Sequence, residues 1–182
     1  MTPRLPGIIT LLLLTLVIAA GSKTIHSAPP LTGSLPEPQA GTLCNHDEQV
    51  IFSCPVKQPA KIVSLCASRN LTKEAGYVQY RFGQPDKIEL EFPSQRTGTQ
   101  RMFHYSHYMR AQFDETQIRF QLNGYEYAVF SDYNGEERPA VNEQGVTVKA
   151  PGKERESRLL CRGKAKADFS TLPDVFENED TR

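Results

Sequence analysis

The sequence predicts an all-β fold, an antiparallel β-sandwich or small β-barrel of about eight strands with little helix. Two observations support this prediction: short segments alternate between apolar and polar residues, and turn-forming residues separate these segments. The clearest example is Thr116 to Asp132, in which two alternating runs meet at Asn123-Gly124. Because Asn-Gly is the strongest short-range signal for a two-residue hairpin, we expect an antiparallel sheet here.

This hairpin is expected to have one apolar face, because residues directly opposite each other on paired strands point to the same side of the sheet. Gln117, Arg119, Gln121 and Glu126 fall on the other, polar side. The apolar face is predicted to hold the pairs Leu122 with Tyr125, Phe120 with Tyr127, and Ile118 with Val129.

The first 22 residues have the pattern of a signal peptide. Arg4 is the one early charge, and an apolar run follows from Ile8 to Ala20. This run of about 13 residues suits a signal peptide and is shorter than the ~20 residues of a membrane-spanning helix. The small residues from Ala20 to Ser22 offer a cleavage site, so we expect residues 1–22 to be removed, with an uncleaved anchor as the alternative. The mature chain is then secreted or periplasmic, without stable membrane insertion.

Three segments follow this leader. Residues 23–42 contain four prolines and few large apolar residues, a composition that predicts a flexible linker. Residues 43–176 have a length that suits a single β domain. Residues 177–182, ENEDTR, are predicted to form a frayed acidic tail.

The charge balance argues against nucleic acid as a partner. The chain carries 21 basic and 21 acidic residues, and the predicted leader removes only Arg4. Nucleic acids and anionic lipids call for a basic surplus or a basic stripe. The one basic cluster, Lys149 to Lys166, is diluted by Glu154 and Glu156. We therefore expect no nucleic-acid binding.

Four cysteines in an exported chain predict two structural disulfides. Cys44, Cys54, Cys66 and Cys161 contain no CxxC pair, which argues against a zinc finger or a redox motif. The sequence leaves all three pairings open. In each of them Cys161 joins the C-terminal strand to the N-terminal cysteine region, which closes a loop of at least ~94 residues.

Alternation also defines the strands that precede the Asn-Gly hairpin. In one of them, Gln79 and Arg81 alternate with apolar residues, so their side of the sheet is expected to face water. The expected strands in this part of the chain are Gln49–Cys54, Lys61–Ala67, Val78–Phe82, Ile88–Phe92 and Met102–Phe113.

Short elements follow the Asn-Gly hairpin. Tyr133 to Pro139, YNGEERP, predicts a loop with its own Asn-Gly turn. Two further strands are expected at Gly145–Lys149 and Arg158–Cys161. Phe169 to Phe176 can cover the sheet with one apolar helical turn.

Two histidines are the first candidates for a metal site or a catalytic base. His104 and His107 are three residues apart, and residues at that spacing in a strand face opposite sides of the sheet. The HxxH spacing also lacks the helix geometry of a zinc hydrolase motif. We therefore predict a packed His107, an exposed His104 and no metal site.

Other catalytic patterns are weak. No G-x-S-x-G elbow and no glycine-rich phosphate loop occurs in the sequence, so neither a serine nucleophile nor a cofactor is predicted. The alternative that we keep is a small extracytoplasmic hydrolase that uses His104 with Asp114 or Glu115. A structural envelope protein is a further alternative.

The tyrosines favour a binding role, since tyrosine supplies rigid, amphipathic contact area. The leading hypothesis is a secreted or periplasmic non-enzymatic binding module that recognises a protein or a glycan, in one form as an inhibitor of an extracellular enzyme. The loop after the hairpin has an aromatic base, a turn and two adjacent acids. The candidate binding residues are Tyr133, Asn134, Glu136, Glu137 and Arg138 of this loop, with Tyr108 nearby.

Overall fold

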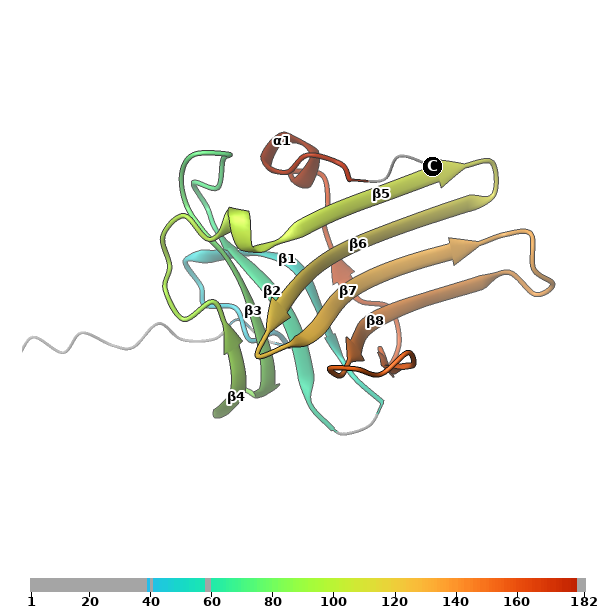
Figure 1. Cartoon of the computed structure of the whole chain (residues 1–182), viewed down its shortest axis with the longest axis horizontal. Helices are drawn as coiled ribbons and strands as arrows, with labels where there is room; N and C mark the ends of the chain where they lie inside the picture. Colours follow the sequence, from blue (N-terminus) through green and yellow to red (C-terminus); the bar gives the residue numbers. More distant parts are fainter. Residues whose placement is uncertain (1–38, 40, 58–59, 180–182) are drawn as a thin grey trace, which may run out of the picture. The chain divides into compact units, whose positions relative to one another are not determined.

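Two antiparallel sheets of five strands each form the fold (Figure 1). The computed structural model describes residue 39, residues 41–57 and residues 60–179, all within one compact unit that spans Ser34–Arg182. The strand order is β10-β1-β2-β3-β4 in the first sheet and β5-β6-β7-β8-β9 in the second. The all-β prediction is confirmed, and the arrangement is sandwich-like with no closed barrel among these strands. The predicted signal peptide, most of the predicted linker and residues 180–182 lie outside the described residues.

Ten strands and two short helical segments are present in the described part of the chain. None of these helical segments is long and apolar enough to cross a membrane. The elements are β1 (Glu48–Pro55), β2 (Ile62–Ser68), β3 (Val78–Gln84), β4 (Lys87–Phe92), η1 (Gln100–Met102), β5 (His104–Arg110), β6 (Phe113–Leu122), β7 (Tyr125–Asn134), β8 (Val141–Lys149), β9 (Glu156–Leu160), β10 (Lys166–Ala167) and α1 (Leu172–Val175).

The Asn-Gly hairpin joins β6 to β7, and its predicted register is confirmed. All three predicted pairs are Cα partners in the structure. Asn123 and Gly124 both have positive φ, 51° and 79°, as a tight two-residue turn requires. The apolar face packs against the first sheet, with the rings of Phe120 and Tyr80 4.9 Å apart. The hairpin therefore supplies one wall of the hydrophobic core.

One predicted strand is wrong. Met102–Phe113 was expected to be continuous, but β5 ends at Arg110 and the chain reverses at Ala111 and Gln112 before β6 begins. Gln112 takes a φ of 62°, which residues with a side chain seldom adopt. Because neither turn residue is Gly, Asn, Asp or Pro, the sequence carries no ordinary turn signal here.

Both predicted disulfides are present. Cys44 pairs with Cys66, which are 22 residues apart, and Cys54 pairs with Cys161, which are 107 residues apart. The second bond connects β1 to the residue that follows β9, so it closes the long loop expected for Cys161. The described chain contains no free cysteine.

The outer face of β3 is buried, contrary to the prediction that it faces water. Arg81 is 1% exposed and Gln79 is 0% exposed. The chain before β1 folds over them, and the Cys44–Cys66 disulfide fixes this cover to β2. Gln39 and Thr42 belong to this cover and hydrogen-bond within it, although the sequence assigned them to the linker.

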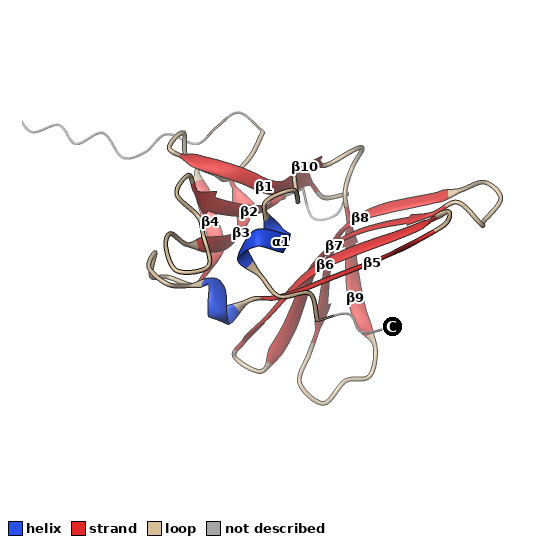
Figure 2. Ribbon diagram, turned by 90° about the horizontal axis from the view of Figure 1, so that it is seen from above, coloured by secondary structure: helices blue, strands red, loops and turns tan. Residues whose placement is uncertain are grey.

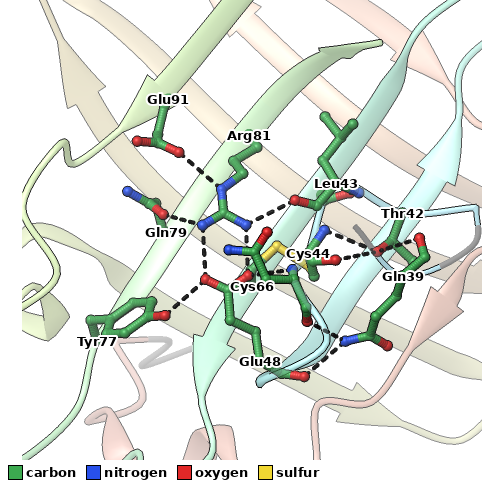
Figure 3. Close-up of polar contacts among 12 residues, drawn as sticks. Gln39, Thr42, Leu43, Cys44, Glu48, Cys66, Tyr77, Gln79, Arg81 and Glu91 are labelled. Atoms are coloured by element: carbon green, nitrogen blue, oxygen red, sulfur yellow. Dashed lines mark hydrogen bonds and ion pairs between the residues drawn. A yellow bond between two sulfur atoms is a disulfide. The ribbon is translucent and has the colours of Figure 1, made fainter. Parts of the chain in front are cut away.

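A closed network of polar contacts fills the space under this cover (Figure 3). Arg81 donates to both carboxylate oxygens of Glu48, at 2.6 and 2.8 Å, and to the Leu43 carbonyl oxygen at 2.8 Å. Its remaining contacts are with Gln79 and Glu91. Burial alone would raise the pKa of Glu48, but hydrogen bonds from Arg81 and from the Asn45 N–H, together with the Arg81 charge, hold it below its ordinary value.

The C-terminal segment returns to the edge strand β5. Leu172 and Val175 of α1 are buried in the core, and α1 lies beside the β5 edge in both views (Figure 1, Figure 2). Beyond α1, Asn178 forms a parallel bridge with Tyr105 of β5. Residues 177–179, which the sequence assigned to a frayed tail, thus run along this edge.

Candidate functional site

The outer face of the second sheet carries a hollow of about 340 Å³, which is the candidate functional site. Strands β5 to β9 all contribute to its lining. The hollow faces away from the core, because most of its lining residues alternate along each strand with core residues such as Ile118, Val129 and Val146. Phe120 and Tyr127 also border the hollow, although their side chains pack in or against the core. The polar half of the Asn-Gly hairpin therefore forms the floor of the site.

Charges of both signs line this hollow. Its basic side chains are His104, Arg119, Lys149 and Arg158, and its acidic ones are Glu126, Asp132 and Glu156. The sequence placed Arg119 of β6 and Glu126 of β7 on one polar face. It gave no signal that β8 and β9 bring further charged side chains beside them.

Arg158 is the central basic group of the hollow. Its guanidinium lies 4.4 Å from the ring centroid of Phe130, a cation–π contact. It also contacts Asp132 at 3.3 Å and Glu143 at 3.2 Å. Arg158 is 42% exposed, so ligand atoms in the hollow can reach it.

Asp132 is the carboxyl group with the most perturbed acidity in the hollow. Burial, together with the nearby charge of Glu115, raises its pKa to about 6, although Arg158 acts in the opposite direction. Its Oδ1 atom is buried and has no hydrogen-bond partner among the described residues. The group therefore changes charge in a mildly acidic medium.

A carboxylate from the C-terminal segment contacts two residues that line the hollow, His104 and Arg119. Glu179 lies 2.6 Å from Nδ1 of His104 and 3.1 Å from a guanidinium nitrogen of Arg119. Burial would raise the pKa of Glu179, but the hydrogen bond and charge of His104, with those of Arg119, keep it below its ordinary value. Arg119 thus pairs with this acid and also donates to the Ser106 hydroxyl at 3.3 Å.

The predicted binding loop lies at the far end of the sheet. Arg110 at the β5–β6 turn forms a two-pronged ion pair with Glu136, with the second contact at 2.9 Å. The Gly135 N–H donates to the Gln112 carbonyl oxygen at 2.7 Å, which also connects the two hairpin tips. Glu136 is thus already paired within the chain.

The other candidate loop residues have different surroundings. The Asn134 side chain accepts the Glu136 N–H, and Arg138 donates to the Gly135 and Glu137 carbonyl oxygens. Tyr133 remains 42% exposed. Tyr108 packs its ring edge-on against Phe113. None of these side chains lines the hollow.

The structure separates the residues of the hydrolase alternative. His104 pairs with Glu179, whereas Asp114 lies on the opposite face and contacts Nε2 of His107 at 3.1 Å. Glu115 shares the face of His104, but its Cα partner in the sheet is Tyr108, four residues along β5 from His104. In the described chain, no hydrogen bond joins either histidine to a hydroxyl or a thiol.

One group of side chains has the composition of a metal site. Ligand atoms of Cys44, Glu48 and Cys66 lie within 4.8 Å of one another. The two sulfur atoms are bonded to each other and the carboxylate is occupied by Arg81, so no thiolate is available there for a cation. This group belongs to the buried network rather than to the candidate site.

Comparisons with known proteins yield no relative. No family model, no curated protein and no solved structure matches the chain.

Proposed function

We propose that this protein is a non-enzymatic binding module that recognises a protein partner outside the cytoplasm through the hollow on β5–β9. The observation that carries this proposal is an open hollow in which strands of one sheet present acidic and basic side chains together. Such a pattern suits a partner with complementary charges, since charge complementarity gives specificity and speeds association.

The surroundings of Phe130 favour a protein over a glycan. Phe130 is 1% exposed, because Arg158 lies across it. Its ring therefore offers no free face on which a sugar could stack. Guanidinium groups, by contrast, are enriched at protein interfaces.

The location outside the cytoplasm rests on two observations. Two disulfides are consistent with an oxidising compartment. The first 22 residues have the pattern of a signal peptide, which would direct the chain there.

The proposal is tested by filling the hollow. Gln117→Trp places a bulky side chain on its floor, and Gln95→Trp makes the same change on the exposed loop after β4. Wild-type and variant domains are immobilised, and extracytoplasmic proteins that they retain are measured for affinity. We expect a partner to bind wild type and Gln95→Trp alike and to bind Gln117→Trp at least ~10-fold more weakly, about 1.4 kcal/mol.

Two results would contradict this proposal. If the partner binds Gln117→Trp as tightly as wild type but is lost when Glu136 and Glu137 are both changed to Ala, the distal loop is the binding site instead. If no protein is retained by any of these domains, the proposed function is wrong.

A further inference from the structure

The C-terminal segment makes hydrogen bonds to the edge of β5 like those of an added β-strand. The Asn178 side chain accepts the His107 N–H at 2.9 Å and donates to the His107 carbonyl oxygen at 2.7 Å. The Glu179 N–H donates to the Tyr105 carbonyl oxygen at 2.9 Å. These are the outward main-chain groups that a partner strand would use in β-strand addition.

The same segment supplies a carboxylate to a basic pair in the hollow. Glu179 contacts His104 and Arg119, which lie side by side as Cα partners on β5 and β6. The neighbours of Arg119 on this face of β6 and β7 include the uncharged Gln117, Gln121 and Ala128, with Glu126 diagonally opposite. Arg119 also donates to the Ser106 hydroxyl at 3.3 Å. The carboxylate that contacts its guanidinium at 3.1 Å, that of Glu179, comes from outside the sheet.

The contacts of this segment are exposed. Side-chain exposure is 55% for His104, 41% for Arg119 and 44% for Glu179. Ion pairs at such exposure stabilise little, and the segment must lose conformational freedom to form them. A longer strand with the same chemistry can thus displace it.

From these contacts we infer that the β5 edge, together with His104 and Arg119, is a docking site for an extended acidic peptide segment of a partner protein. Asn178 and Glu179 occupy this site in the unbound chain and compete with the partner. The inference rests on the proposed function, since it identifies which segment of the partner enters the hollow.

The experiment uses the full chain and a defined probe. The probe is a labelled, end-blocked peptide FENEDTR, the sequence of residues 176–182. It is titrated into wild type, into the double variant Asn178→Ala with Glu179→Gln, and into the control Glu177→Gln. We expect the double variant to bind the peptide at least tenfold more tightly than wild type, and the control to behave as wild type.

Two further arms define specificity. A peptide in which the acid equivalent to Glu179 is Gln, or a scrambled peptide, is expected to bind the double variant at least tenfold more weakly. Adding Arg119→Gln to the double variant is expected to abolish the gain. Equal binding by wild type and the double variant, or by native and scrambled peptides, overturns the inference.

Hydrogen exchange provides a readout that does not depend on affinity. The His107 amide is expected to exchange faster in the double variant and to regain protection when peptide is added. A wild-type dimer that becomes monomeric in the double variant would assign the site to the tail of a second copy and overturn the inference. If the peptide fails to bind while Gln117→Trp still weakens partner binding at least ~10-fold, this inference is wrong and the proposed function stands.

Discussion

Arg81 and Arg158 lie on the outer faces of the two sheets, and each contacts two carboxylates. Arg81 is 1% exposed and makes hydrogen bonds to Glu48, Glu91, Gln79 and the Leu43 carbonyl oxygen. Arg158 is 42% exposed and rests on Phe130.

The two arginines differ in exposure because different lengths of chain cover the two sheets. On the first sheet, the chain before β1 covers the arginine and is fixed there by the Cys44–Cys66 disulfide. On the second sheet, the described cover is limited to Asn178 and Glu179 at one edge. The Arg81 network is therefore closed off from solvent, whereas the Arg158 network is open to it, as the proposed binding role requires.

The largest expected effect is a difference in the free energy of unfolding between variants of the two arginines. Arg81→Met leaves the buried Glu48 without its cation, so we expect a loss of about 3–5 kcal/mol in the free energy of unfolding. Arg158→Met breaks exposed pairs and should cost less than about 1 kcal/mol. Urea denaturation of both variants measures this difference. Similar losses in the two variants would mean that the networks do not differ as described.

An intermediate effect is expected when the cover is released. Changing Cys44 and Cys66 together to Ala opens a loop of 22 residues, which should cost about 3 kcal/mol. The cover should then open, and amides of residues 42–45 should exchange faster. The hollow on the second sheet should keep its ligand affinity, because it does not contact this disulfide. A change in that affinity would show that the two regions are coupled.

The smallest expected effect is on how the free energy of unfolding changes with pH. The folded-state pKa of Asp132, about 6, exceeds its ordinary value of 3.8, so the folded protein loses stability as pH rises between these values. Asp132→Asn should remove this slope and stabilise the protein by about 1–2 kcal/mol at pH 7.

Glu48 serves as a control for that experiment, because folding shifts its pKa in the direction opposite to that of Asp132. Its pKa is lowered on folding, so its contribution is present at neutral pH and disappears as pH falls below about 4.5. Denaturation at a series of pH values tests both signs. An unchanged slope in Asp132→Asn between pH 4 and 6 would contradict the assignment of that slope to Asp132.

Local chemistry explains which parts of the fold could be predicted. Asn123-Gly124 is a strong turn signal, so the sequence predicted the register of β6 and β7 residue by residue. Ala111-Gln112 makes an equally tight reversal with no such signal, and the prediction missed it. The cysteine count and the predicted signal peptide together predicted two disulfides, while their pairing depends on which strands become neighbours.

The buried Arg81 network and the candidate site were both less predictable, because each depends on contacts between distant parts of the chain. Arg81 alternates like a residue that faces water, and only the folded cover shows that it is buried. Glu179 lies 60 residues from Arg119, and an acidic tail by itself indicates no partner. The loop with Tyr133 and Glu137 was predicted to bind a partner from its local composition alone.

The strand order of the two sheets has a consequence for folding. In the second sheet each strand pairs with its neighbour in sequence, from β5 through to β9. Contacts of this kind close short loops and form quickly. In the first sheet, however, β10 pairs with β1, so Phe52 has its partner Ala167 only when the C-terminal part of the chain is present. A chain that emerges from its N-terminus would therefore complete its second sheet while the first still lacks β10. The Cys54–Cys161 bond can form as soon as Cys161 follows β9, before β10 joins the first sheet.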